Sequence, residues 1–407
     1  MLTACILACL AGCAQGTPLP TPISEIARGI SWVSPYWGYN TPKIVFDGDT
    51  YYTVGLWGAS PDAAHGVLYC LDGGKWREGA SLPDIYQPPT LVLDRDKRLV
   101  VAYTLKEKPA RFLRSRKPGS ADAFDEIPPP PDMLNAYYIG IAVRDETLYL
   151  GYLAEPSYTM FLAMLNLSRL EWTPSIVMQE GQVKQKPKTA WTYPILFPTA
   201  EGLHVVATNC PDGSEGNTYN EVWYVFYPPG TAAPARREKV ADCPVGHSAY
   251  AMDMLVDKTG AVHVIFMWNQ RKYGEPLPSD SPEEGVYHAW RDPTTGQWHR
   301  ARLGPISICG FHGGPDGPVA IITQPGAIRA LEWRGAAEGW VELPPLCDPG
   351  SIISGPSFMD VLSSSSGSQV QAKPVLVFDG PFPIQEYESA GRVLQAFLPK
   401  QSSLQVR

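Results

Sequence analysis

Two histidines and two tyrosines stand at comparable places in the sequence and could carry acid–base chemistry. His247 and Tyr250 open the apolar segment HSAYAMDML, His312 lies in ICGFHGG, and Tyr193 opens YPILFP. Histidine titrates near neutrality, and a tyrosine hydroxyl can exchange a proton with a reacting oxygen. One residue could remove the proton beside a uronic acid carboxylate while another protonates the leaving oxygen. We therefore expect His247, His312, Tyr250 and Tyr193 to be the catalytic candidates of a polysaccharide lyase-like reaction.

Aromatic and amide side chains precede several other apolar segments in the same way. Flat aromatic faces with nearby hydrogen-bonding groups suit a sugar ring, which offers apolar C–H patches and a rim of hydroxyls. Each of these side chains could instead pack against neighbouring structure. As a set they predict a carbohydrate-binding surface made of Trp37, Tyr39, Asn40, Tyr86, Gln87, Tyr138 and Trp191.

Two reactions on a glycan are conceivable, elimination and hydrolysis, and the sequence identifies the further groups that each would need less clearly. A lyase also needs a cation or neutral donors near the substrate carboxylate, and Arg271 and Arg329 are only loop candidates. Glycoside hydrolysis needs two opposed carboxylates, which Asp253, Asp316 and Asp360 could supply near the starts of apolar segments. Strand alternation could equally turn those carboxylates into packing contacts. Hydrolysis therefore ranks below elimination.

A regular repeat of short strands must position these residues. Residues 247–303 read as four strands joined by hairpin turns, with a Trp near the start of the last strand. The second strand of each such unit is expected at Tyr51, Leu99, Thr147, Leu203, Val262, Pro318 and Lys373. The intervals between these positions are 48, 48, 56, 59, 56 and 55 residues, which fit one propeller blade each. Two consecutive β-sandwiches would not explain so even a repeat.

The sequence thus predicts an all-β fold, a seven-bladed β-propeller of four-stranded antiparallel blades over residues 27–407. The last unit is one strand short, and the segment ARGISWVS at residues 27–34 has no partner of its own. A ring closed by this N-terminal strand would leave no open sheet edge. The residues that open each first strand would then converge on one axial pocket.

Short turns that end in Trp recur before the last strand of a unit. The segments DGGKW (72–76), DPTTGQW (292–298) and AAEGW (336–340) resemble degenerate Asp boxes of sialidase-like, BNR-repeat propellers. The resemblance implies a structural role, with the Trp packed between blades, and some propellers of this type are lyases built on His, Tyr and Arg. The arginine cluster and Arg-Ile-Pro signature of true sialidases are absent, so sialidase activity is not expected.

The N-terminus has the features of an export signal. Residues 2–12 are an apolar run too short to span a bilayer, and Leu-Ala-Gly-Cys at 10–13 resembles the bacterial lipoprotein box. This implies a signal peptide at 1–12, lipidation of Cys13 and a tether at 13–26. No Lys or Arg precedes the apolar run, which departs from the usual pattern. We expect an exported protein that is anchored to the bacterial cell envelope, at the outer membrane or cell surface, through its lipid alone.

Composition and motifs exclude several other classes. A net charge of −8 argues against nucleic acid as a partner. No CxxC, HExxH, phosphate-binding Gly loop, GxSxG or dinucleotide fingerprint occurs, so no metal and no cofactor is expected. Export would permit disulfides. Cys210 with Cys243 and Cys309 with Cys347 are plausible pairs, and Cys70 is left over.

Two hypotheses of different classes follow. The first is a lipid-anchored propeller that binds a glycan at its axial pocket and could cleave it by lyase-like chemistry. The alternative is a non-catalytic propeller that acts as a surface binding or assembly module. Whether the protein is an enzyme stays open at this level.

Overall fold

The computed structural model is all-β in the residues that it describes. These are residues 24–29, 44–47, 49–57, 65–72, 75–87, 89–181, 190–209, 221–243, 248–269, 284–305, 309–313, 318–324, 327–344, 360–362, 375–379 and 391–396. Within these ranges the chain forms only β-strands, turns and loops. Among them there is no helix that is long and apolar enough to cross a membrane.

The strands form antiparallel sheets of successive chain segments, numbered here in chain order. Sheet 1 comprises β2 (Ile44–Phe46), β3 (Tyr51–Trp57), β4 (His65–Asp72) and β5 (Lys75–Leu82). Sheet 2 comprises β6 (Thr90–Leu93), β7 (Leu99–Tyr103), β8 (Arg111–Ser115) and β9 (Phe124–Ile127). Sheet 3 has five strands, β10 (Tyr137–Arg144), β11 (Thr147–Ala154), β12 (Thr159–Asn166), β13 (Glu171–Trp172) and β14 (Ile176–Gln179).

The remaining sheets have four strands each. Sheet 4 comprises β15 (Trp191–Pro198), β16 (Leu203–Asn209), β17 (Glu221–Tyr227) and β18 (Arg236–Asp242). Sheet 5 comprises β19 (Ser248–Val256), β20 (Val262–Asn269), β21 (Gly285–Arg291) and β22 (Trp298–Gly304). Sheet 6 comprises β23 (Cys309–Gly313), β24 (Pro318–Gln324), β25 (Ala327–Trp333) and β26 (Trp340–Glu342). Sheet 7 joins the chain ends, in the order β1 (Ser24–Gly29), β29 (Gly391–Ala396), β28 (Val375–Asp379) and β27 (Asp360–Leu362).

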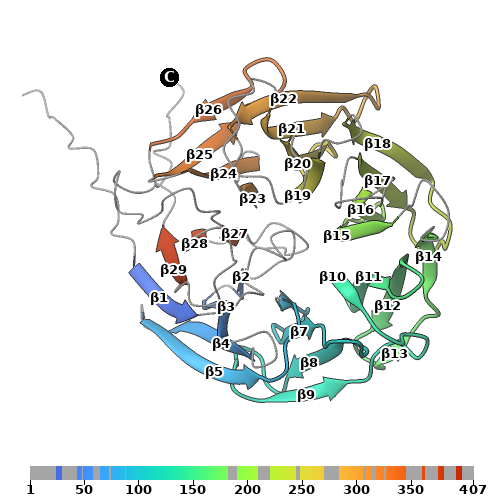
Figure 1. Cartoon of the computed structure of the whole chain (residues 1–407), viewed down its shortest axis with the longest axis vertical. Helices are drawn as coiled ribbons and strands as arrows, with labels where there is room; N and C mark the ends of the chain where they lie inside the picture. Colours follow the sequence, from blue (N-terminus) through green and yellow to red (C-terminus); the bar gives the residue numbers. More distant parts are fainter. Residues whose placement is uncertain are drawn as a thin grey trace, which may run out of the picture.

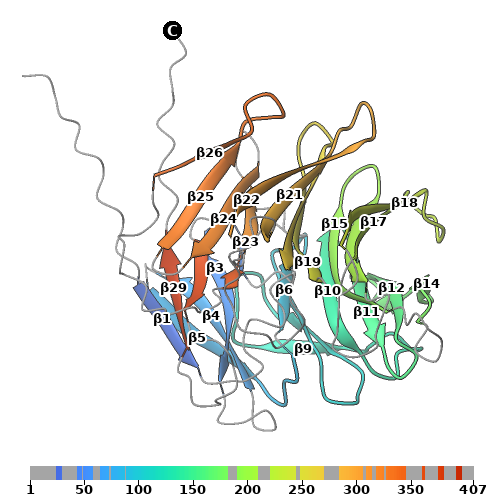
Figure 2. The same cartoon turned by 45° about the horizontal axis from the view of Figure 1, so that its top comes forward.

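The sheets are arranged around a common centre (Figure 1). The first strand of each of sheets 1 to 6 lies nearest the centre, and consecutive first strands contact one another from β2 and β6 through β10, β15, β19 and β23 to β27. The turned view shows the same strands stacked side by side with a common tilt (Figure 2). Because all these strands run the same way, they begin on one side of the ring, which we call the mouth face.

The repeat in the sequence located the second strands well. β3, β7, β11, β16, β20 and β24 begin at the predicted residues, whereas β28 begins at Val375 and not at Lys373. The N-terminal strand β1 begins at Ser24, three residues before the predicted strand, and pairs with β29. Sheet 3 departs from four strands because β14 pairs with β12 beyond the short β13.

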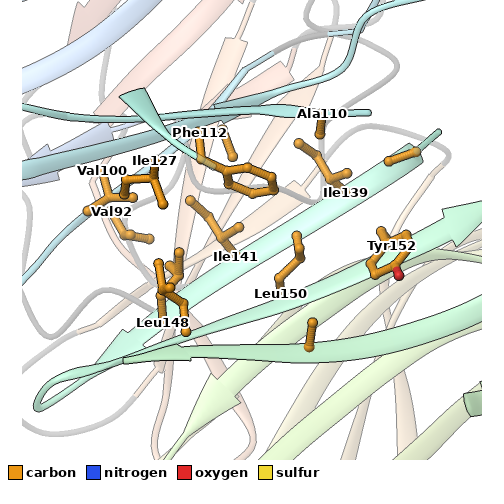
Figure 3. Close-up of a cluster of buried hydrophobic side chains, with 14 of the residues drawn as sticks. Val92, Val100, Ala110, Phe112, Ile127, Ile139, Ile141, Leu148, Leu150 and Tyr152 are labelled. Atoms are coloured by element: carbon orange, nitrogen blue, oxygen red, sulfur yellow. The ribbon is translucent and has the colours of Figure 1, made fainter. Parts of the chain in front are cut away.

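Hydrophobic cores fill the space between neighbouring sheets. Every residue of β7 is buried, because both faces of sheet 2 are covered, so the strand reads as a continuous apolar run. On one side, Val100 and Phe112 of sheet 2 meet Ile141 and Leu150 of sheet 3 (Figure 3). Burial of apolar surface is thus repeated between neighbouring sheets from sheet 1 to sheet 6, where the structure describes the side chains.

The Trp residues of the turn motifs join neighbouring sheets, as their pattern predicts. The Trp298 ring of sheet 5 packs edge-on against Tyr224 of sheet 4, and its Nε1–H donates to Glu238 Oε2 at 2.8 Å. Trp340 of sheet 6 packs against His288 of sheet 5 and donates to its Nδ1 at 3.1 Å. These residues stabilise contacts between sheets and take no part in a site.

The approach of sheets 3 and 4 near the centre depends on glycine. A Cβ placed on Gly140 would lie 2.1 Å from the Pro194 carbonyl oxygen, and one on Gly151 would lie 2.9 Å from Pro194 Cβ. Real Cβ atoms do not approach backbone oxygen so closely. Gly140 and Gly151 therefore allow Pro194 to sit directly on sheet 3.

Replacing Gly140 by alanine is expected to lower the free energy of unfolding by about 2 kcal/mol or more, because backbone must shift to remove the overlap. Gly335→Ala is the matched control, since its Cβ meets nothing within 4 Å and only the left-handed φ of 92° opposes it. That control is expected to cost about 1 kcal/mol. Urea unfolding of both variants measures the difference, and equal losses would contradict the role given to the Pro194 contact.

Candidate functional site

Three tyrosines from three consecutive innermost strands meet on the mouth face. Tyr138 of β10 and Tyr193 of β15 have ring centroids 4.5 Å apart, and Tyr193 and Tyr250 of β19 have centroids 6.4 Å apart. Tyr193 is buried between the other two, which are half-buried. We call these residues the tyrosine trio. Two members were predicted as catalytic residues and Tyr138 as a binding residue, and the structure brings the three together.

The backbone is irregular at each member of the trio. The register of β10 shifts between Tyr137 and Gly140, that of β15 between Thr192 and Ile195, and that of β19 between Ala251 and Asp253. Tyr138 and Tyr193 have φ of 46° and 54°, in the left-handed region that bulky residues rarely adopt. Bulges turn side chains away from the regular alternation, and strained backbone of this kind is concentrated at functional sites.

Side chains from the preceding sheet hold these irregular strands in place. Gln87 Oε1 accepts a hydrogen bond from the Tyr138 N–H at 2.8 Å. Thr208 Oγ1 of β16 accepts one from the Ala251 N–H, next to Tyr250, at 3.0 Å. A buried backbone N–H without a partner is costly, so each acceptor fixes the position of the strand beyond it. Gln87 and Thr208 are therefore positioning residues of the trio.

A carboxylic acid lies at the same side of sheet 3, in the loop that follows β11. Burial raises the pKa of Tyr137, and the nearby Glu155 carboxylate adds to the rise. The Glu155 N–H in turn donates to Asn135 Oδ1 at 2.9 Å. Burial raises the pKa of Glu155, the Tyr137 hydrogen bond opposes this, and the Glu107 carboxylate adds to the rise.

The sequence analysis did not single out Glu155. Its signal is the turn LAEPSY between the second and third strands of sheet 3, a connection that reaches the mouth face in this architecture. Tyr86, a predicted binding residue, packs edge-on against Tyr137 with centroids 5.6 Å apart, so it belongs to this cluster. Burial also raises the pKa of Tyr86, followed by the charges of Glu155 and Glu107.

Other predicted residues have structural contacts. Trp191 is 1% exposed, stacks on Trp223 and lies under the Arg237 guanidinium, so its ring offers no open face to a ligand. Gln87 is 5% exposed and its oxygen is used by Tyr138. For both, packing explains the position better than the predicted sugar contact does.

The predicted charged residues whose side chains the structure describes form contacts within the protein. Asp253 is buried, and its Oδ2 accepts the Phe311 N–H of β23 at 2.7 Å, so it is the blade contact that strand alternation allowed. Arg329 lies on β25, not in a loop, and forms a two-pronged ion pair with Glu342. Neither residue is placed for the role of catalytic carboxylate or substrate cation.

Several predicted residues lie outside the described residues, and for His312 and Asp360 only the strand position is described. His312 belongs to β23 and Asp360 begins β27. Those outside are Cys13, Trp37, Tyr39, Asn40, Cys210, His247, Arg271, Asp316 and Cys347, with the predicted signal peptide and most of the tether.

The cysteines that the structure describes are buried. Cys309 is a free thiol on the innermost strand β23, so the predicted pairing with Cys347 is wrong. That pairing assumed an outer-strand position, which Cys309 does not have. Burial raises the pKa of the Cys243 thiol to about 12. Within the described residues no group of three His, Cys, Asp or Glu could hold a metal ion.

Among the described residues, the buried histidines His263 and His288 form hydrogen bonds within the interior. His288 Nδ1 accepts from Trp340, so its Nε2–H donates to His263 Nδ1 at 2.9 Å, and His263 Nε2–H donates to Asp257 Oδ2 at 3.2 Å. Burial lowers the pKa of His288 well below 6.5, and His263 adds to this. Although burial alone would raise it, hydrogen bonds from His263 and Thr259 bring the pKa of Asp257 to about 2.

Comparison with known proteins supports the class defined by this fold, an all-β propeller. Neither a family model nor a curated protein matches the sequence. Among solved structures, the chain is similar to a polysaccharide lyase, "PL25-Ulvanlyase", with a TM-score of 0.65 and 9% identity over 92% of this chain and 95% of that one. It is also similar to polysaccharide lyase Uly1, with a TM-score of 0.61 and 11% identity over 93% and 99% of the two chains.

A third similar structure belongs to a different class of carbohydrate-active enzyme. This is the GH93 alpha-L-arabinofuranosidase of Fusarium graminearum with arabinobiose, with a TM-score of 0.50 and 12% identity over 76% of this chain and 92% of that one. At such identities the likeness shows the fold alone, and chemistry must be argued from the site.

Removing the acceptor oxygen at residue 208 should loosen the trio. Thr208→Val keeps shape and volume but leaves the buried Ala251 N–H unpaired, which is expected to cost about 1–3 kcal/mol of unfolding free energy. Thr208→Ser keeps the oxygen and serves as the control. Amide hydrogen exchange at Ala251 should accelerate in the valine variant only, and equal exchange in both would show that the hydrogen bond is unimportant.

Stability should fall with acid because of the buried histidines. Burial lowers the pKa of His204 to about 4 from its ordinary 6.5, so below pH 6.5 the unfolded chain binds a proton that the folded chain refuses. The stability present above pH 6.5 is therefore lost progressively toward pH 4, by roughly 3 kcal/mol from this group. His204→Gln should flatten the pH dependence of urea unfolding, whereas His299→Gln, at an exposed position, should not. A pH profile identical in His204→Gln and the parent protein would refute this account.

Proposed function

We propose that this chain binds a glycan on the mouth face and cleaves it by β-elimination. The tyrosine trio supports this most directly: three rings from separate sheets meet at one place, on backbone that is strained at two of them. Aromatic faces with hydroxyl groups match a sugar ring in shape and polarity. We further infer that the seven sheets are the blades of one propeller whose ring β1 closes, which would place the trio beside the axis.

The proposed reaction divides the acid and base roles. His247 or His312 would take the proton beside the uronate carboxylate, the electrons of that C–H bond would form the new double bond, and the glycosidic C–O bond would break. A hydroxyl of the trio, Tyr193 or Tyr250, would protonate the leaving oxygen.

Similar folds occur in two polysaccharide lyases and in an arabinofuranosidase, so the preference for elimination over hydrolysis rests on the residues of the site. Opposed carboxylates, which hydrolysis requires, are not found at the trio in the described residues, since Asp253 is committed to Phe311. Export and a lipid anchor at Cys13 belong to the same proposal, and metabolic labelling with a palmitate analogue would test them.

The experiment is a screen of uronate-containing polysaccharides for the ultraviolet absorbance of an unsaturated product. Tyr193→Phe keeps the ring contacts with Tyr138 and Tyr250 but removes the hydroxyl, so kcat should fall about 100-fold or more with KM little changed. His247→Ala should abolish cleavage. Tyr149→Phe, on the far part of β11, is the control and should leave the rate unchanged.

The outcomes separate the two hypotheses. Binding of a glycan without unsaturated product across the panel would favour the non-catalytic module. Cleavage that survives in both His247→Ala and Tyr193→Phe would remove these residues from the mechanism.

A further inference from the structure

Most arginines of the described residues are paired with carboxylates. Salt bridges within 4 Å occupy Arg77, Arg95, Arg111, Arg114, Arg116, Arg144, Arg169, Arg291, Arg329 and Arg334. Apart from Arg98, the arginines that form no such pair, among those whose side chains the structure describes, all lie on the outermost strands β18 and β22. They are Arg236, Arg237, Arg300 and Arg302. Unpaired guanidinium groups are therefore concentrated on two adjacent sheets of an acidic chain, whereas the exposed lysines Lys97, Lys106, Lys108 and Lys117, which form no such ion pair, lie around sheet 2.

Three of these arginines face the seam between sheets 4 and 5. Arg236 stands opposite Phe226, and Arg300 stands opposite Ala289. Phe226 and Ala289 belong to one core that joins the two sheets. Arg302 stands opposite Tyr287, on the same face as Arg300, because residues two apart on a strand share a face. Arg237 faces the other way and donates to the Met178 carbonyl oxygen. We call Arg236, Arg300 and Arg302 the cationic stripe.

The carboxylate at the centre of the seam is already neutralised. Glu238 accepts two hydrogen bonds from Arg291, at 2.8 and 3.1 Å, and a third from Trp298 at 2.8 Å. This contact also sets the register of β18 against β22. Arg236 lies two residues before Glu238, and Arg302 lies four residues after Trp298. At roughly 3.3 Å per residue the stripe extends over about 20 Å of the rim.

The stripe's guanidinium groups are exposed and held in fixed settings. Arg236 lies over the Phe226 ring at 5.2 Å and Arg300 over Trp268 at 5.3 Å. Arg302 donates from Nε and Nη2 to the Glu284 carbonyl oxygen at 3.0 and 2.8 Å. A stacked guanidinium keeps its in-plane N–H donors, which match the geometry of carboxylate and sulfate oxygens. The strands β18 and β22 follow one another along the outer edge of the molecule, where the Trp298–Glu238 hydrogen bond joins them (Figure 1).

We propose that the cationic stripe binds the acidic groups of a polyanionic glycan along the seam between sheets 4 and 5. The inference rests on the proposed function and adds to it a second contact, away from the reacting sugar, for the carboxylate or sulfate groups of a long acidic chain. The stripe acts at a distance from the tyrosine trio, so it raises affinity for long acidic chains and leaves the chemistry at the trio alone.

The test compares two triple variants of the full chain. R236Q/R300Q/R302Q removes the stripe, and R77Q/R111Q/R116Q removes the same charge from ion-paired positions on sheets 1 and 2. Affinity for polygalacturonate, with neutral dextran as the reference, is measured at increasing salt. We expect the stripe variant to lose at least about tenfold in affinity at low salt and most of the salt dependence, and the control to keep both. Because the positions are exposed, both variants should unfold at similar temperatures, and R300Q alone provides a milder change.

Equal affinities of the stripe variant, the control and the parent protein for polygalacturonate would overturn the inference. So would a DNA duplex that displaces the polysaccharide at equal phosphate and carboxylate concentration, because the stripe would then be a general polyanion site.

Short uronate oligosaccharides separate this inference from the proposed function. Cleavage of such oligosaccharides that Tyr193→Phe abolishes and the stripe variant retains would support both. Polymer binding through the stripe without any cleavage would contradict the lyase proposal alone.

Discussion

The arrangement of the central strands depends on hydrogen bonds that cross from one sheet to the next. Where β10 and β19 bulge, the Tyr138 and Ala251 N–H groups donate to Gln87 and Thr208 of the preceding sheet. Asp253 does the same for the Phe311 N–H of β23. An N–H left without an acceptor in this interior would cost more than an ordinary hydrogen bond contributes. The acceptors therefore fix each of these innermost strands relative to its neighbour. They also fix the aromatic side chain that the strand carries.

This constraint explains how strained residues persist at the mouth face. A tyrosine in the left-handed region is unfavourable by about 1–3 kcal/mol, and the surrounding structure must over-determine it. At β15 the constraint is steric: Pro194 follows Tyr193 directly and is pressed against Gly140 and Gly151 of sheet 3. The trio is thus built on rigid strands rather than on loops, which suits a site that must hold acid and base groups in fixed positions.

The periodicity of the sequence predicted the architecture because each unit buries the same kind of surface. Tyr51, Leu99 and Val262 begin second strands as expected, since turns and apolar runs recur at blade spacing. The orientation of single side chains was harder to predict from the sequence. Both Trp191, at the start of β15, and Gln87, in the loop before β6, stand where a ligand contact was predicted, yet both are buried by contacts with residues distant in the sequence. Glu155 escaped notice because the groups that act on its pKa besides burial, Tyr137 and Glu107, are distant in the sequence.

The charge of the protein also differs between the chain as a whole and particular parts of its surface. A net charge of −8 is the sum over the whole chain, and taken alone it indicates repulsion of polyanions. In the described part, most carboxylates that could attract Arg236, Arg300 and Arg302 are engaged elsewhere, and Glu238 is neutralised by Arg291. What matters for a ligand is the local field within about a Debye length, near 10 Å, and not the total. An acidic protein can therefore present a cationic rim where its arginines have no carboxylate partner, as on β18 and β22.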